Sequence, residues 1–439
     1  MTPVKSTSLR AWSLSRYPDK FSVEVWEAGD KPGGVASTVL DLGNGLWVNE
    51  QVQGGFQHSY ANTLLLLKKL DIKPQATWPG VRLSVGNATL HHEYWDNFSD
   101  QASFPVLERH ATETARFLEL LRSMMQGWRQ ALGVLPIGWL LRMLRFSNEF
   151  QRDILYPLLV TLNGTGNQMA RTPSAVVANI LMHPIMRVLG PGSQARLLAP
   201  HSQGPQHFIF SNLQQAYAQL AERIAREPGC SVHCSTPVSS MSYCKAKGGP
   251  RWRLVSEAAH REGVFDKVIF TCGPEATLKL LATSALPDSW LYRFVFNRFE
   301  VYDVSIITHT DEPYIRRHYG LDPSRPEELP LWMVRWVRQR AGSPGQGLPQ
   351  AELSYALSIA YKHWNLTDQL VFQTNIVQDP GIDPSKVLSK RTARHVAMTF
   401  GSLIVPSLTM GRLQDRHGAL FAGAYMMGNP HEAATHASM

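Results

Sequence analysis

The spacing of apolar and polar positions near the start of the chain predicts a short β strand followed by a tight turn. Phe21, Val23 and Val25 occupy alternate positions, which is the period of a strand with one buried face. The strand closes on Glu27, and the stretch GDKPGG over residues 29–34 supplies the break. An acid at the tip of a strand, followed by a flexible turn, is therefore the first feature to explain.

Helical spacing dominates most of the first half of the chain. Residues 9–17 predict the end of a helix, and the leucines at 64–67 predict another. From about residue 104 to 200 the pattern is mostly helical. Residues 205–225 predict a turn and then an amphipathic helix, whose apolar face carries Leu213, Tyr217, Leu220 and Ile224.

Strand signals dominate the second half. Three strand-like runs follow the amphipathic helix: SVHCSTPVSSMSY, RWRLVSE and KVIFTCGP. From residue 296 to 378 apolar and polar positions alternate, as in VYDVSIITHT, which predicts an antiparallel sheet. Near the end, ALFAGAY predicts one more strand with a glycine at its tip. We therefore expect helices and strands to be mixed along the chain.

The most apolar segment, GVLPIGWLLRMLRF at residues 133–146, is too short to span a bilayer and contains Pro136 and two arginines. A buried core helix is favoured over an interfacial or pocket-lining helix. Residues 1–20 lack the apolar stretch of a secretory signal. The sequence thus predicts a cytoplasmic protein without a transmembrane segment.

Length and composition fit a globular protein of two or three domains. The 439 residues are 44% hydrophobic and 18% charged, which supplies a large core. The 43 Lys and Arg residues exceed the 35 Asp and Glu residues, for a formal net charge of +8. This excess is spread along the chain without a basic block, so a nucleic acid partner is not expected. A mildly basic surface is favoured over attraction to an anionic substrate or membrane.

The four cysteines are too few for a disulfide framework. Cys230, Cys234 and Cys244 lie close to His233, but they lack the paired C-x-x-C spacing of a zinc site. We expect free, partly buried thiols and no metal.

Glu27 and the glycines after it suggest a nucleotide site. In a dinucleotide-binding βαβ unit, an acid at the end of the second strand accepts hydrogen bonds from the adenosine ribose. Glycines such as Gly33 and Gly34 let the backbone approach the ligand. The alternative is a surface turn that carries a charge. KVIFTCGP and ALFAGAY favour the nucleotide, because both are strands that end in small residues.

Together these motifs resemble the flavin-dependent amine oxidase superfamily, in the branch of NAD/FAD-binding, amine oxidase-domain oxidoreductases. The resemblance covers nearly the whole chain. It rests on VEVWEAGDKPGGVAST, LWVNEQVQGG, STPVSSM, FDKVIFTCGPEATLKLL, THTDEP and ALFAGAYMMGNPHEAATHAS.

The resemblance implies FAD as the cofactor and assigns residues to it. Glu27 would bind the adenosine ribose, and Gly33 and Gly34 would flank the pyrophosphate. Val238 would contact the adenine through its backbone. The third strand would support the cofactor through Thr271, Cys272 and Gly273. The residues near the ribityl chain and flavin ring would be Gly423, Ala424, His431 and Glu432.

The implied fold is α/β, with a discontinuous Rossmann-like FAD-binding domain and an inserted α+β substrate domain. The FAD-binding domain would comprise residues 1–60, 205–290 and 405–439, and the substrate domain residues 61–204 and 291–404. The sequence departs from the family pattern in two places. It has no glycine before Gly29, so the expected N-terminal G-x-G-x-x-G turn is missing, and Val35 follows the glycine pair where an arginine or histidine is common.

The implied function is an FAD-dependent oxidoreductase that transfers a hydride from a small or lipophilic organic substrate to the flavin. The alternative is a cofactor-free, non-catalytic relative or a truncated product that acts as a binding protein. Retention of Glu27, the glycine pair and GAYMMGNPHE favours the enzyme, and the missing glycine turn favours the alternative.

Candidates facing the flavin ring lie in the flavin-proximal loop LWVNEQVQGG. They are Asn49, Glu50, Gln51 and Gln53. Burial would let Glu50 act as a general base, and the alternative is a solvated loop carboxylate.

Further along, THTDEP favours a hairpin turn over a charged pair of His309 and Asp311. Sheet packing is favoured over a substrate pocket for four aromatic residues: Trp332, Trp336, Tyr361 and Trp364.

Overall fold

A computed structural model describes most of the chain. The described residues are 5–34, 38–39, 47–50, 54–56, 61–72, 75–76, 85–87, 93–95, 108–163, 169–182, 207–209, 212–246, 249–325, 329, 332–337, 350–361, 369–376, 381–423 and 425.

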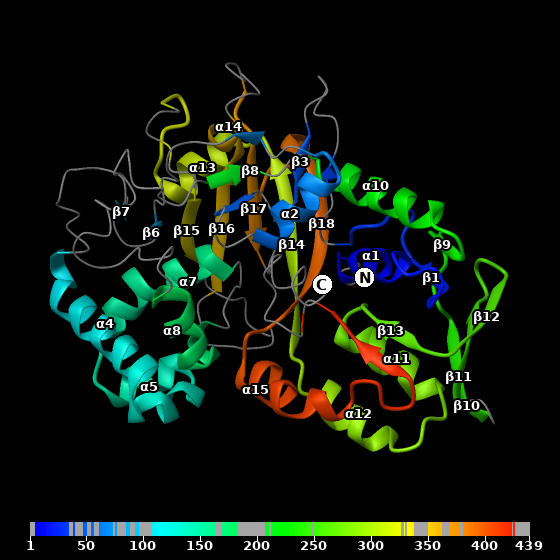
Figure 1. The fold of residues 1–439 in the computed structure, drawn as a ribbon. Helices are drawn as coiled ribbons and strands as arrows, with labels where there is room; N and C mark the ends of the chain where they lie inside the picture. Colours follow the sequence, from blue (N-terminus) through cyan, green and yellow to red (C-terminus); the bar gives the residue numbers. More distant parts are fainter. Residues whose placement is uncertain are drawn as a thin grey trace.

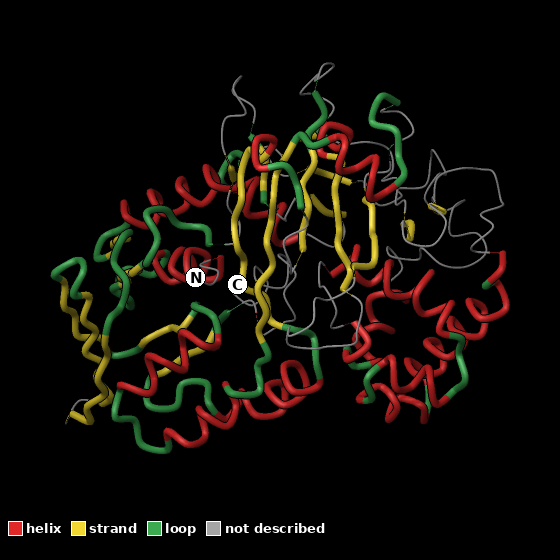
Figure 2. Tube along the Cα trace, turned by 180° about the vertical axis from the view of Figure 1, so that it is seen from behind, coloured by secondary structure: helices red, strands yellow, loops and turns green. Residues whose placement is uncertain are grey.

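An antiparallel sheet of long strands forms the middle of the molecule (Figures 1 and 2). Its described strands run in the order β15-β16-β17-β14-β18, and every neighbouring pair is antiparallel. The predicted antiparallel sheet is confirmed, but its edge strand β18 lies beyond residue 378. The bounds are β14 (Val301–His309), β15 (Trp332–Val337), β16 (Gln350–Ala356), β17 (Phe372–Ile376) and β18 (Val387–Val396).

Two parallel strand pairs lie to one side of this sheet. β1 (Val23–Trp26) pairs with β9 (Cys230–His233), and β13 (Val268–Phe270) pairs with β19 (Ala419–Phe421). Each pair joins segments that lie far apart in the sequence, so this α/β unit is discontinuous, as predicted. Beside it stands an antiparallel meander of β10 (Ser240–Ala246), β11 (Gly249–Ser256) and β12 (Arg261–Phe265).

Helices pack on the β1–β9 pair through apolar side chains. They are α1 (Lys5–Ser15), α2 (Ala61–Lys69) and α10 (Leu213–Arg226). The face predicted for α10 is confirmed, because its four apolar residues all lie in this core. The side chain of Asn212 caps the helix by accepting a hydrogen bond from the backbone N–H of Gln215. The limits of the two predicted domains stay a prediction.

A second core surrounds β13 and β19. The rings of Phe270 and Phe421 stack with centroids 5.3 Å apart. Around them pack α11 (Pro274–Thr283), α12 (Ser289–Phe296) and the segment that follows α15 (Phe400–Thr409).

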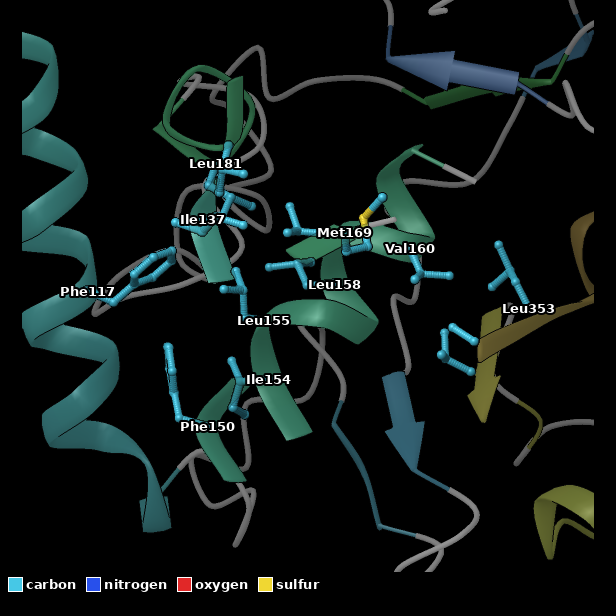
Figure 3. Close-up of a cluster of buried hydrophobic side chains, with 14 of the residues drawn as sticks. Phe117, Ile137, Phe150, Ile154, Leu155, Leu158, Val160, Met169, Leu181 and Leu353 are labelled. Carbon is cyan, nitrogen blue, oxygen red and sulfur yellow. The ribbon is translucent and has the colours of Figure 1, made fainter. Parts of the chain in front are cut away.

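A helical lobe packs on the opposite end of the antiparallel sheet, and the largest cluster of buried apolar residues in the described chain lies between the two (Figure 3). The lobe confirms the helical prediction for the described part of residues 104–200. Its helices are α4 (Ala111–Gln126), α5 (Ile137–Met143), α6 (Asn148–Phe150), α7 (Tyr156–Asn163) and α8 (Ser174–Met182), with a 3-10 helix (Trp128–Val134) and a π-helical turn (Gln151–Leu155). In α5, Leu140 and Leu141 are buried as predicted, whereas Trp139 is half-exposed.

The prediction for THTDEP is wrong. This segment joins β14 to a helix, α13 (Glu312–Tyr319), instead of turning into a hairpin. The carboxylate of Asp311 caps that helix by accepting a hydrogen bond from the N–H of Tyr314 at 3.0 Å. The His309 ring is buried against Thr374, and burial lowers its pKa to about 4. A neutral imidazole therefore faces the core, and no ion pair with Asp311 is needed.

The remaining described elements are short. They are β2 (Thr38–Val39), β3 (Val48–Asn49), β4 (Gly54–Phe56), β5 (Gln75–Ala76), β6 (Val85–Asn87), β7 (Glu93–Trp95), β8 (His207–Ile209), α14 (Leu357–Ala360) and 3-10 helices at Met169–Arg171, Pro384–Lys386 and Met410–Arg412. The four cysteines are free thiols, as predicted; three of them are partly buried, whereas Cys244 is exposed, contrary to the prediction. A helix able to cross a bilayer is not found among the residues described.

Candidate functional site

Glu27 stands at the carboxyl end of β1, where the chain leaving β9 crosses in front of it. The carbonyl oxygen of Glu27 accepts a hydrogen bond from the N–H of Thr236, and that of Gly29 accepts one from Ser235, both at 2.7 Å. These bonds extend the parallel pairing past the end of the strands. The predicted STPVSSM and acid-glycine segments are thus brought together at one edge.

The Glu27 carboxylate is only half satisfied within the protein. Its Oε1 accepts a hydrogen bond from the N–H of Gly29 at 2.7 Å. Its Oε2 is buried and has no hydrogen-bond partner among the described residues. Glu27 as a whole is only 6% exposed. Burial raises the pKa of this carboxyl group, and the backbone hydrogen bonds oppose that rise. A buried acceptor without a donor lowers the stability of the folded protein by about 1–3 kcal/mol, unless a ligand donates a hydrogen bond to it.

Two glycines in the turn beyond Glu27 have positive φ angles, which favour glycine over other residues. Gly33 has φ of 125° and Gly34 has φ of 57°, in the region that side chains disfavour. The turn is fixed from two sides. The Gln214 amide of α10 donates to the carbonyl of Pro32 at 2.7 Å, and the Arg391 guanidinium of β18 donates to the carbonyl of Gly34 at 3.2 Å.

The ends of β13 and β19 converge on the same region. The Cys272 thiol lies 3.3 Å from the hydroxyl of Thr277. Burial raises the pKa of this thiol, and the negative charge of Glu27 raises it further. At the tip of β19, a Cβ on Gly423 would lie 1.9 Å from the ring of Tyr425. Only glycine fits there with the ring in this position.

Thr271, Gly273 and Val238 flank these strand ends. Thr271 is buried, and Gly273 begins helix α11 as its N-cap. Val238 is half-buried and packs on the core around Phe270. Ala424, His431 and Glu432 lie outside the described residues.

In the loop predicted to lie near the flavin, the structure describes Asn49 and Glu50, while Gln51 and Gln53 lie outside the described residues. The Asn49 side-chain oxygen accepts hydrogen bonds from the hydroxyl of Thr38 at 2.7 Å and from the N–H of Leu213 at 3.3 Å. Asn49 therefore joins this loop to the start of α10.

Glu50 is 1% exposed, so the alternative of a solvated carboxylate is wrong. Its Oε2 lies 2.8 Å from Nη1 of Arg391, with which it forms an ion pair. The same guanidinium bonds the glycine turn at Gly34. Arg391 thus connects two segments of the site to the central sheet.

Sequence reasoning missed Arg391. The signal that could have found it is the alternation in VLSKRTARHV, which predicts a strand with Arg391 and Ala393 on the same face.

Among the aromatic candidates, Trp336 and Tyr361 belong to the packed interior. The Trp336 indole donates a hydrogen bond to the carbonyl of Arg152 at 3.2 Å, and Tyr361 meets Trp47 edge-on. Trp364 and the side chain of Trp332 lie outside the described residues.

A family model described as flavin containing amine oxidoreductase matches residues 11–371 of the chain. Comparison with curated protein sequences found no match.

Solved structures of several oxidoreductases and an isomerase share the fold. A proposed protoporphyrinogen oxidase from Exiguobacterium sp. 255-15 has a TM-score of 0.64 at 14% identity and covers 100% of this chain and 95% of its own. A CLA-producing fatty acid isomerase from P. acnes has a TM-score of 0.62 at 12% identity, with the same coverage of 100% and 95%. Cyclohexylamine oxidase from Brevibacterium oxydans IH-35A has a TM-score of 0.61 at 14% identity, and the match covers 100% of this chain and 95% of the oxidase. At such identities the likeness concerns the fold alone.

Proposed function

The chain belongs to the family of flavin-containing amine oxidoreductases, and we propose that it is an FAD-dependent oxidoreductase that transfers a hydride from an organic substrate to the flavin. The observation that carries this proposal is the buried Oε2 of Glu27 without a donor, at the tip of a parallel strand. If the chain were a cofactor-free binding protein, this buried oxygen would have no hydrogen-bond donor from a cofactor.

The described residues fit the adenosine end of FAD. A ribose presents two neighbouring hydroxyls, which are the donors that the Glu27 carboxylate lacks. Gly33 and Gly34 give the turn beyond it a backbone without side chains, which suits a close approach by the pyrophosphate. Gly423 is also a proposed cofactor contact, although the Tyr425 ring occupies the space beside its Cα. Val238, Thr271 and Gly273 remain proposed contacts of the cofactor.

The chain's own residues would bind, orient and exclude water. When bound, the flavin supplies the redox chemistry by accepting two electrons from the substrate. Arg391 and Glu50 would hold the flavin-proximal loop against the glycine turn, because the guanidinium bonds both segments. This geometry supports an anchoring role for Glu50 over that of a general base, since Oε2 is engaged by Arg391. Gln51 and Gln53 remain proposed residues of the ring face.

The fold does not indicate the substrate. The similar structures include proteins named for a fatty acid, for cyclohexylamine and for protoporphyrinogen, so one fold serves several substrate classes. A small or lipophilic organic molecule is proposed here, without preference for an amine.

The test is flavin retention by the purified chain. The protein is incubated with FAD, passed through gel filtration, and its visible absorption recorded, with Kd then measured by flavin fluorescence. Glu27→Gln should weaken FAD binding at least tenfold, because a hydrogen bond to a charged group contributes about 1.5–3 kcal/mol. The matched control is Glu24→Gln on the same strand, where the carboxylate pairs with Arg261 and binding should not change.

Two outcomes would contradict the proposal in different ways. Unchanged FAD affinity in Glu27→Gln would exclude the ribose contact. A folded wild-type chain that takes up no flavin would support the cofactor-free alternative.

A further inference from the structure

Helix α15 buries its apolar side chains incompletely. Its sequence is FGSLIVPSLT, yet its buried residues are Ser402 and Pro406. Phe400 is exposed and Leu408 is 77% exposed. Leu403, Ile404 and Val405 are partly buried. Amphipathic helices of water-soluble domains normally bury the whole apolar stripe, so α15 leaves part of its apolar surface exposed.

The neighbouring helix α12 exposes two more large apolar side chains. Its inner face is formed by Tyr292, Val295 and Phe296, which are buried in the core. Trp290 is 66% exposed, and Phe294 follows one turn later and is also exposed. Residues four apart lie on the same helix face.

The two helices are in contact and lie along the same edge of the molecule in both views (Figures 1 and 2). We call the region formed by Trp290, Phe294, Phe400 and Leu408 the α12–α15 surface.

Cationic side chains border the α12–α15 surface. Arg293, Arg298 and Arg412 are exposed, and within the described part of the chain none of them has a carboxylate partner within 4.0 Å. The guanidinium of Arg298 lies over the ring of Phe294 at 4.9 Å. The nearby acids are neutralised by other residues.

Two acids near the α12–α15 surface are neutralised by arginines outside the set just named. Asp288 pairs with Arg416, and Glu300 pairs with Arg171 at 2.6 Å. Exposed apolar side chains and arginines without a carboxylate partner among the described residues thus occur together on α12, on α15 and in the turns that follow them.

This combination fits an anionic lipid surface. Helices that lie in the membrane interface carry Trp, Phe and Leu on one face and Lys or Arg beside them, and they gain from both apolar burial and attraction to anionic lipids. A second copy of the chain fits less well, because a two-fold contact would place the same arginines against each other. We propose that the α12–α15 surface docks this protein peripherally on an anionic membrane, with Trp290 and Leu408 entering the interface.

The experiment measures co-sedimentation of the full-length chain with vesicles. The vesicles are phosphatidylcholine alone, or phosphatidylcholine with phosphatidylglycerol. Binding should require phosphatidylglycerol and weaken as salt rises. The double variant Trp290→Ser, Leu408→Ser should bind at least about tenfold more weakly. Each of Arg293→Gln and Arg412→Gln should weaken binding about fivefold.

The matched control is the double variant Val264→Ser, Leu388→Ser. Both side chains are exposed, but they belong to β12 and β18, away from this surface. The control should bind like the wild type, and thermal melts should show that every variant stays folded.

Three results would overturn the proposal. The first is an absence of binding to anionic vesicles. The second is binding that the Trp290 and Leu408 substitutions leave unchanged. The third is a concentration-dependent dimer, seen by light scattering, that the same substitutions abolish, because the surface would then be an interface between two copies.

Discussion

At the scale of single residues, Glu27 is in an environment that suits a ligand better than it suits the ligand-free protein. The side chain is buried, and Oε2 has no donor among the described residues. Burial raises the pKa of the carboxyl group, because a charge in a low dielectric is disfavoured. A buried carboxylate that lacks a donor lowers the stability of the ligand-free protein. It contributes to ligand affinity when the ligand supplies the hydrogen-bond donors.

The pH dependence of stability should reveal this burial. The ordinary pKa is 4.5 and the folded value is higher, so between them the folded state binds more protons than the unfolded state. The free energy of unfolding of the FAD-free protein should therefore fall as pH rises through this window. Glu27→Gln should flatten that fall and be more stable than the wild type at pH 7. Urea unfolding at several pH values measures both effects.

Glu24→Gln is the control for this series as well, because Glu24 is on the same strand and its pKa is lowered. A Glu27→Gln variant that keeps the wild-type slope would show that this carboxyl group titrates normally.

Arg391 is the other residue on which the site depends. It bonds Glu50 and the carbonyl of Gly34, which lie 341 and 357 positions away. In its ion pair with Glu50, the glutamate side chain is almost fully buried and the arginine side chain is partly exposed. A guanidinium can serve both acceptors at once, whereas an ammonium is a point charge without this fork.

Arg391→Met should lower the free energy of unfolding by about 1.5–3 kcal/mol, the range for hydrogen bonds to charged groups, and should weaken FAD binding. Arg391→Lys should recover only part of either loss. Denaturant unfolding and flavin titration measure the two quantities. Lys390→Met, at an exposed neighbouring position of the same strand, should change neither. Equal FAD affinity in Arg391→Met and the wild type would exclude a role in holding the site.

At the scale of elements, one buried carboxylate joins α13 to the sheet. Glu352 of β16 accepts hydrogen bonds from the hydroxyls of Tyr314 and Tyr319 at 2.6 and 2.7 Å. It also pairs with Arg335 of β15 at 2.8 Å. Tyr314 and Tyr319 both belong to α13, so the helix is held at two points. Burial and the charge of Glu352 raise the pKa of both tyrosines, which keeps them as donors.

Glu352→Gln should destabilise the protein by about 3–5 kcal/mol, because it leaves the buried charge of Arg335 without its partner. Thermal or denaturant unfolding measures the loss. Glu262→Gln is the contrasting variant, since it breaks an ion pair with Arg253 that is exposed on both sides, and it should leave stability nearly unchanged. Similar losses in the two variants would mean that burial does not decide the contribution of these pairs.

At the scale of the whole molecule, the candidate site draws on segments that span most of the chain. Glu27, Thr236, Cys272, Arg391 and Gly423 come from five separate elements or their ends. A ligand that binds only this assembly stabilises all of it by mass action.

FAD at a hundred times its Kd should therefore raise the free energy of unfolding by about 2.7 kcal/mol. Differential scanning fluorimetry should show a higher Tm for the wild type with FAD and a smaller rise for Glu27→Gln at the same concentration. An FAD-independent Tm for a protein that binds FAD would mean that the unfolded chain binds it equally well.

Much of this architecture could be predicted from short stretches of sequence. The strand before Glu27, the glycine turn and the apolar face of α10 follow from periodicity and from residue types with narrow backbone preferences. Those signals are local, because each lies within a few turns of helix or a few residues of strand. The resemblance to the family added the order of the segments and the expectation of FAD.

The sequence by itself determined which segments could form strands, which helix faces are apolar, and where backbone freedom was needed. Only the tertiary structure decided that Arg391 reaches Glu50 and Gly34, that Glu352 bonds two tyrosines of α13, and that α15 leaves Phe400 and Leu408 exposed. The physical reason is that burial and pairing depend on partners hundreds of positions away, and no local pattern encodes which partner arrives.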